Sequence, residues 1–190
     1  MLPEKPPGKK FHFDTLYVKM RHIVSSEGFL QISKKKYNLN TIYISERLQE
    51  NLKPISQSAF TAVTAPMGYG KTTAINWYLD KQSKNGNSCV IRISIYSDNL
   101  SVFWQSVQKA FAFAGLDFLD NYSCPSDAAS AGMLADELCY SLSGQISYYI
   151  FIDDFHLLGE PHIADFFCML ANRLPENIHL IVSGRNAFLS

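Results

Sequence analysis

Short apolar runs alternate along the chain with longer segments in which hydrophobic residues recur at helical spacing. Four of the apolar runs have the length of strands and are rich in β-branched residues. They lie at residues 60–64, 89–95, 148–154 and 178–183. Because these runs are largely continuous and do not alternate with polar positions, the pattern predicts a mainly parallel sheet covered by helices on both faces. The predicted fold class is therefore three-layer α/β/α.

Helical periodicity predicts five helices around these strands. Their expected spans are residues 44–52, 71–84, 101–114, a segment that begins near Ser126 or Asp127 and stops at Gly144, and 161–174. Ser45 is the expected N-cap of the first. The third carries its large side chains on one face, as a core helix does: Phe103, Trp104, Val107, Phe111 and Ala114.

Residues 60–73 have the order of strand, Gly/Pro-containing loop and helix that a phosphate-binding P-loop requires. Amide groups at such a helix start point at an anion, and the helix dipole adds about half a positive charge. We expect Lys71 to reach the β- and γ-phosphates and the Thr72 hydroxyl to coordinate Mg²⁺. The expected nucleotide-binding residues are Pro66, Gly68, Tyr69, Gly70, Lys71, Thr72 and Thr73.

Two acidic residues, Asp153 and Asp154, end the apolar run at 148–154. Open parallel sheets bind ligands at the carboxyl ends of their strands, so the acids and the P-loop are expected at one edge, on neighbouring strands. Asp153 would hold Mg²⁺ through water, and Asp154 would orient or polarise the attacking water. Taken alone, the acids are also compatible with an ordinary Asp-rich turn. We assign no catalytic role to His156.

Arg185 directly follows the last strand, so it projects from the same edge. A cation at that place senses the γ-phosphate or stabilises charge during phosphoryl transfer. The residues alone leave an ordinary surface arginine as an equal alternative.

Length and composition agree with one globular domain preceded by a short extension. At 190 residues and 47% hydrophobic content the chain can bury a core, and its 17 basic and 17 acidic residues cancel. This balance gives no global footprint for nucleic acid or for an anionic membrane. No secretory signal is expected at the N-terminus, and no apolar run approaches the ~18 residues of a membrane span. A cytoplasmic protein is expected.

The cysteines and histidines show no metal-binding pattern. Cys89, Cys124, Cys139 and Cys168 are widely scattered without a C-x-x-C pair, which predicts reduced core thiols. The five histidines lack the spacing of a zinc site.

Several segments resemble MalT-like, LuxR-type bacterial regulators, which belong to the signal-transduction (STAND) ATPases. Residues 64–73 resemble their Ala-Pro-Ala-Gly-Tyr-Gly-Lys-Thr-Thr loop, and residues 152–158 are similar to their Asp-Asp-Tyr-His segment. Residues 174–185 are similar to their Pro-Glu-Asn strand leading to Thr-Ser-Arg. Shorter likenesses occur at residues 46–48, 97–99 and 103–104.

The resemblance covers residues 42–190, which it marks as a partial STAND ATPase domain after an N-terminal extension at residues 1–41. In that extension a helix is expected at residues 13–24 and a solvated basic loop at 33–36. The resemblance implies that ATP and Mg²⁺ bind, that hydrolysis is slow, and that the chain is truncated before the full STAND module. It also implies self-association in the ATP state, and DNA contact only through a helix-turn-helix domain not present in this chain.

Two other functions remain open at this stage. One is a stand-alone P-loop ATPase or kinase with fast turnover, although no acceptor signature is visible. The other is a degenerate nucleotide-binding module without hydrolysis. Ala65, where the general P-loop pattern has glycine, and the large Met67 motivate the second alternative.

Overall fold

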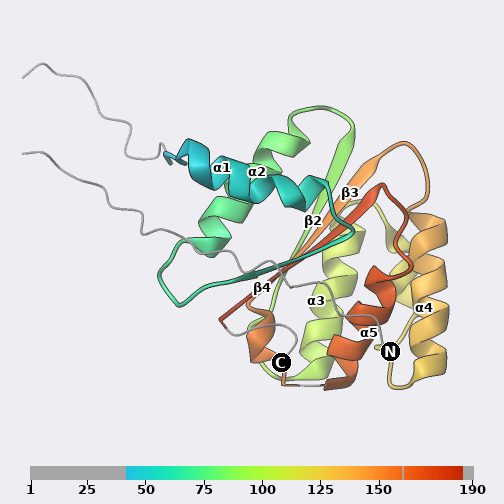
Figure 1. Cartoon of the computed structure of the whole chain (residues 1–190). Coiled ribbons are helices and arrows are strands. Elements are labelled where there is room, and N and C mark those ends of the chain that lie inside the picture. Colours follow the sequence, from blue (N-terminus) through green and yellow to red (C-terminus); the bar gives the residue numbers. More distant parts are fainter. Residues whose placement is uncertain (1–41, 160, 186–190) are drawn as a thin grey trace, which may run out of the picture.

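A four-stranded parallel sheet, in the order β1-β4-β3-β2, forms the centre of the computed structural model (Figure 1). The structure describes residues 42–159 and 161–185, so the helix expected at 13–24 and the basic loop at 33–36 lie outside the described residues. The strands are β1 (Phe60–Thr64), β2 (Ser88–Ser94), β3 (Ser147–Asp153) and β4 (Ile178–Gly184). Each lies within one residue of its predicted span, and the predicted parallel sheet is confirmed.

The five predicted helices are all present. They are α1 (Glu46–Leu52), α2 (Lys71–Ser83), α3 (Leu100–Phe113), α4 (Ala128–Ser141) and α5 (Pro161–Ala171). The last two end about three residues earlier than expected. The periodicity did not reveal three short 3₁₀ helices, η1 (Lys53–Ser56), η2 (Asp117–Asn121) and η3 (Phe155–Leu157), because one turn is too short to show a repeat.

Side-chain caps fix where several helices begin. The Ser45 hydroxyl accepts from the Leu48 amide at 3.3 Å, which confirms it as the N-cap of α1. Asp127 caps α4 in a reciprocal box with Ser130, whose amide donates to the carboxylate at 2.8 Å. The backbone and side-chain hydrogen bonds from Ser130 lower the pKa of Asp127.

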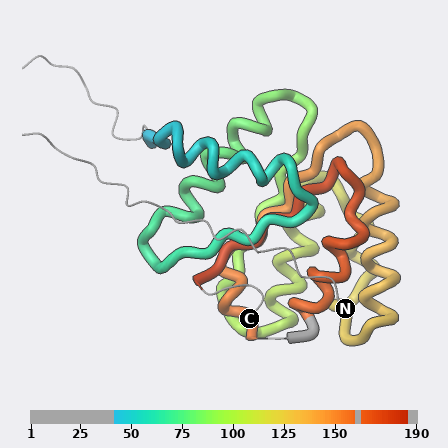
Figure 2. Tube along the Cα trace, in the orientation of Figure 1, coloured from blue at the N-terminus to red at the C-terminus, as the bar shows by residue number. Residues whose placement is uncertain are grey.

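The sheet separates two hydrophobic clusters, as a three-layer fold requires. Helices α1 and α2 cover one face and α3, α4 and α5 cover the other (Figures 1 and 2). Strand β3 alternates between the clusters: Tyr149 and Phe151 face the first pair of helices, and Ile150 and Ile152 face the other three. A strand that is covered on both faces needs apolar side chains at successive positions, which explains why the apolar runs in the sequence are continuous.

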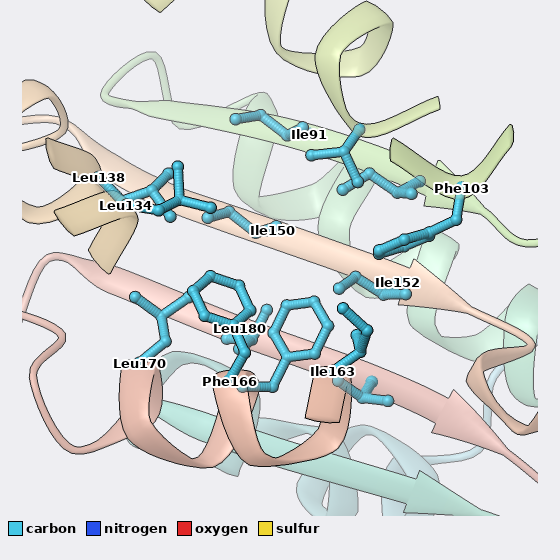
Figure 3. Packing of buried hydrophobic residues seen from close by; sticks show 14 of the residues in the cluster. Ile91, Phe103, Leu134, Leu138, Ile150, Ile152, Ile163, Phe166, Leu170 and Leu180 are labelled. Carbon is cyan, nitrogen blue, oxygen red and sulfur yellow. The ribbon is translucent and has the colours of Figure 1, made fainter. Parts of the chain in front are cut away.

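The larger cluster lies on the three-helix side (Figure 3). In Figure 3, Phe103 of α3 lies near Ile152, Leu134 of α4 lies near Ile150, and Phe166 of α5 lies near Leu180. The predicted aromatic face of α3 is confirmed, because its large residues are buried. No helix within the described residues is long and apolar enough to cross a lipid bilayer.

The four cysteines differ in part from the prediction. All are free thiols, but each is only half-buried, and Cys89 and Cys124 pack against the larger hydrophobic cluster. Burial raises the pKa of all four thiols, that of Cys124 to about 11. They are therefore protonated and weakly nucleophilic near neutral pH.

Replacing Phe151 tests the packing of β3. Phe151 is 2% exposed between the sheet and α2, so Phe151→Ala should lower the free energy of unfolding by about 3–5 kcal/mol. Phe113→Ala is the matched control, because Phe113 is 96% exposed and should change stability by at most about 0.5 kcal/mol. Urea titration followed by circular dichroism measures both. Equal effects in the two variants would contradict the assignment of Phe151 to the core.

Candidate functional site

The loop that joins β1 to α2 has the backbone shape of an anion-binding turn. Gly68 and Gly70 adopt φ of 83° and 73°, a region that only glycine enters at little cost. Gly70 is also the N-cap of α2, and the first helical hydrogen bond runs from the Ala74 amide to the Gly70 carbonyl at 2.9 Å. The three amides between these residues therefore stand at the positive end of the helix dipole.

The two departures from the general P-loop pattern do not distort this loop. Among the described non-glycine residues only Asp154 has a positive φ, so the backbone of Ala65 is one that alanine adopts freely. The Ala65 amide donates to the Gly184 carbonyl at 3.4 Å, which continues the sheet. Met67 is 75% exposed, so its side chain is largely in solvent. Neither residue blocks the turn.

Lys71 is a buried cation with no anionic partner among the described residues. Its side chain turns back under the loop, where Nζ donates to the Ala65 carbonyl at 2.8 Å and to the Pro66 carbonyl at 3.3 Å. The residue is 7% exposed, and no carboxylate of the described residues lies within ion-pair distance of it. Carbonyl dipoles offset only part of the cost of burying a charge, so the site attracts an anion.

The remaining predicted binding residues flank Lys71 in the sequence. Pro66, Tyr69, Thr72 and Thr73 are exposed, and the two threonines occupy the first turn of α2. The structure thus brings the predicted loop residues together around one helix start.

The acids lie at the same edge of the sheet, but not on the strand beside β1. Strand β4 lies between β1 and β3, which corrects the expectation of neighbouring strands. The register pairs Thr64 of β1 with Gly184 of β4, and Ile152 of β3 with Val182 of β4. Because all strands are parallel, their carboxyl ends still meet at one edge (Figure 1).

Ser183 holds the first acid and was missed by the sequence analysis. Ser183 is fully buried, and its hydroxyl donates to Asp153 Oδ1. The Asp154 amide donates to Asp153 Oδ1 at 3.0 Å and to the Ser183 hydroxyl at 3.3 Å. The 8% exposed carboxylate of Asp153 is thereby fixed in one orientation. Only the strand order could have revealed Ser183, since it places the two residues side by side.

Asp154 and Arg185 are the accessible members of the predicted site. Asp154 adopts the left-handed conformation (φ 57°, ψ 36°) as N-cap of η3, and its side chain is 48% exposed. Arg185 is exposed in a bend directly after β4. The positions of both residues agree with the predicted edge, and their catalytic roles stay predictions.

A polar and aromatic groove begins at the P-loop helix. Thr73 at the start of α2 is one of its walls, and Trp77 lies one helical turn further along. The groove is lined by Ile42, Thr73, Asn76, Trp77, Asp80, Lys81 and Lys84. It was not predicted from the sequence, because its far wall comes from the segment before α1.

Together the groups can hold a phosphate chain and a hydrated divalent cation. Amides and one ammonium group offer donors for phosphate, whereas the Asp153 carboxylate offers an oxygen ligand. In the described part of the chain no cluster of three or more His, Cys, Asp or Glu side chains forms a metal site. A cation would therefore depend on Asp153, Thr72 and phosphate oxygens, the kind of site that suits Mg²⁺.

Known proteins resemble this chain in both sequence and fold. The family described as "AAA domain" matches residues 53–189. HTH-type transcriptional regulator MalT from two strains of Klebsiella pneumoniae is 29% identical over 152 residues, which cover 75% of this chain and 16% of each relative. The chain thus spans about a sixth of the length of these curated relatives.

Among solved structures, Cdc6p from Pyrobaculum aerophilum superposes with a TM-score of 0.50 at 17% identity, covering 74% of this chain and 38% of that one. At that identity the likeness shows the fold alone. The matches confirm the predicted P-loop NTPase fold and the similarity to MalT-like regulators.

Ser183→Ala tests how the first acid is held. Removing the buried hydroxyl leaves Asp153 Oδ1 with one donor fewer, so the free energy of unfolding should fall by about 1–3 kcal/mol. Ser143→Ala is the control, because its exposed hydroxyl bonds the Tyr140 carbonyl and water can replace it. Chemical denaturation measures both. A Ser183 variant as stable as the Ser143 variant would contradict the proposed support of Asp153.

Proposed function

This chain belongs to the AAA domain family of P-loop NTPases, and we propose that it binds ATP with Mg²⁺ as a switch that hydrolyses the nucleotide slowly. The observation that carries the proposal is the buried ammonium group of Lys71 at a glycine-bearing helix start, which bonds two carbonyls but no carboxylate of the described residues. The phosphates of a nucleoside triphosphate would supply the negative charge that balances this ammonium group.

In this proposal each group at the edge has one task. Lys71 and the first amides of α2 hold the β- and γ-phosphates, and the Thr72 hydroxyl with Asp153 would hold Mg²⁺. The ion, when bound, offsets charge on the phosphates. Asp154 orients the attacking water, and Arg185 contacts the γ-phosphate.

Contacts that depend on the γ-phosphate are what turn a binding site into a switch. Arg185 and Asp154 are accessible and directly follow strands β4 and β3. Their contacts should therefore differ most between the triphosphate-bound and the diphosphate-bound state. A ligand shifts a conformational equilibrium only through such differential contacts.

The larger setting follows from the similarity to MalT regulators. We infer a cytoplasmic, MalT-like transcriptional regulator in which this domain senses the nucleotide. DNA would be contacted by a helix-turn-helix domain outside this chain, and the ATP state would favour self-association.

In this proposal the adenine base binds in the groove along α2 that Thr73 and Trp77 line. Thr73 belongs to both the P-loop and the groove, so a phosphate chain at the helix start leads directly into it. Trp77 offers a half-buried aromatic ring one turn further, and nucleobases stack on aromatic rings.

Two rival functions give different results in a binding and turnover experiment. Tight binding with slow turnover supports the switch, and fast turnover supports a stand-alone ATPase or kinase. Absence of binding supports a degenerate module. The undistorted loop around Ala65 and Met67 favours an intact site over the degenerate one.

Lys71→Ala tests the phosphate site. Loss of the ammonium group should raise the Kd for ATP by about two orders of magnitude or more, since a charged hydrogen bond worth about 3 kcal/mol is lost. Lys109→Ala on the exposed surface of α3 is the control and should bind as the parent chain does. Isothermal titration calorimetry measures affinity, and circular dichroism checks that the variant is folded. Unchanged binding by a folded Lys71 variant would refute the site.

Trp77 reports on the base. ATP should quench the fluorescence of Trp77, whereas inorganic triphosphate, which has no base, should not. Trp77→Phe should remove most of the ATP-dependent change, because the other tryptophan, Trp104, is buried on the far face of the sheet and bonds the Tyr122 carbonyl at 2.7 Å. Equal quenching by ATP and by triphosphate would place the base elsewhere.

A further inference from the structure

His156 lies close to the second acid, and both of its ring nitrogens are buried and unpaired among the described residues. It lies in η3, directly behind the acidic pair, and its side chain is 12% exposed. Neither Nδ1 nor Nε2 is accessible to solvent or has a hydrogen-bond partner in the part of the chain that the structure describes. Buried polar atoms are nearly always hydrogen-bonded in folded proteins, so a second arrangement that gives at least one of these nitrogens a partner is favoured.

The nearest carboxylate is that of Asp154. The distance from His156 Nδ1 to Asp154 Oδ1 is 3.8 Å, about 1 Å longer than a hydrogen bond. Because 48% of the Asp154 side chain is exposed, its carboxylate has room to rotate. A small side-chain motion is enough to close the gap.

The backbone between the two residues is already set for this contact. Asp154 is the one described non-glycine residue with a positive φ, a conformation that aspartate tolerates better than most residues. The Leu157 amide donates to the Asp154 carbonyl at 2.9 Å, and the Leu158 amide donates to the Phe155 carbonyl at 3.0 Å. These bonds fix the turn, so only side chains need to move.

We propose that His156 is a positioning residue for hydrolysis. In the ATP-bound state its Nδ1–H donates to Asp154 Oδ1 and holds the carboxylate in the orientation that directs the attacking water. His156 donates a hydrogen bond and transfers no proton. This inference rests on the proposed function, and it revises the sequence analysis, in which His156 had no role in the reaction.

Three substitutions in the full chain separate this role from a structural one. His156→Leu removes the donor and should lower kcat for ATP about tenfold, with the Kd for ATP unchanged. His156→Asn places an amide N–H where Nδ1 lies and should recover the rate to within about threefold of the parent. Asp154→Asn should also slow hydrolysis and spare binding. Adding His156→Leu to it should slow the reaction no further, because the two residues act as a unit.

The outcomes distinguish this inference from the function on which it rests. A parent chain that does not bind ATP refutes the proposed function and this inference with it. If ATP binds and His156→Leu hydrolyses at the parental rate, the inference alone is refuted. A rise in Kd that accounts for the loss of rate, or additive effects of the two substitutions, also overturns it.

A second measurement does not depend on turnover. In chain labelled with ¹⁵N-histidine, addition of Mg²⁺ and a non-hydrolysable ATP analogue should shift the Nδ1 resonance of His156. The shift should be absent in Asp154→Ala, which lacks the acceptor oxygen. A resonance that does not move in the parent chain, or that moves equally in the variant, would overturn the contact.

Discussion

The site is built around one buried ammonium group. Lys71 is held under the loop by the carbonyls of Ala65 and Pro66, and no described carboxylate neutralises it. This arrangement requires a loop that curls back over the helix start, which the left-handed Gly68 and Gly70 permit. It also requires a rigid platform, because a charge kept from both water and a counter-ion persists only where the surrounding fold is stable. The parallel sheet between two hydrophobic layers provides that platform.

Strand β4 connects the two halves of the site. It bonds to β1, which leads into the loop, and to β3, which ends in the acids. Through Ser183 it also fixes the orientation of Asp153. Arg185 follows at once, so the loop, the acids and Arg185 leave the sheet from adjacent strand ends.

Much of this could be predicted from the sequence, because local patterns carry it. The apolar runs gave the strands to within one residue. Ser45 marked a helix start as its N-cap, and the start expected near Ser126 or Asp127 lies at Ala128. The order of strand, glycine loop and Gly70-Lys71 gave the candidate site. The resemblance to MalT-like regulators agrees with the family that the chain belongs to.

What could not be predicted depends on strand order and on turns too short to leave a repeat. Ser183 contacts Asp153 only because β4 lies beside β3, and no local sequence pattern predicts the strand order. The left-handed backbone of Asp154 and the burial of His156 arise from a three-residue turn. The half-burial of the cysteines depends on how the helices pack against the sheet.

The central place of β4 also restricts where the length of the chain can vary. A residue inserted between Ile178 and Gly184 would exchange the side chains that face the two layers, and it would separate Ser183 from its acid. Insertions in the exposed turn at residues 85–87 would instead enlarge a surface connection that precedes β2. Divergence in length among proteins built on this plan should therefore gather in the connections, while the short stretch before Arg185 keeps a constant count of residues.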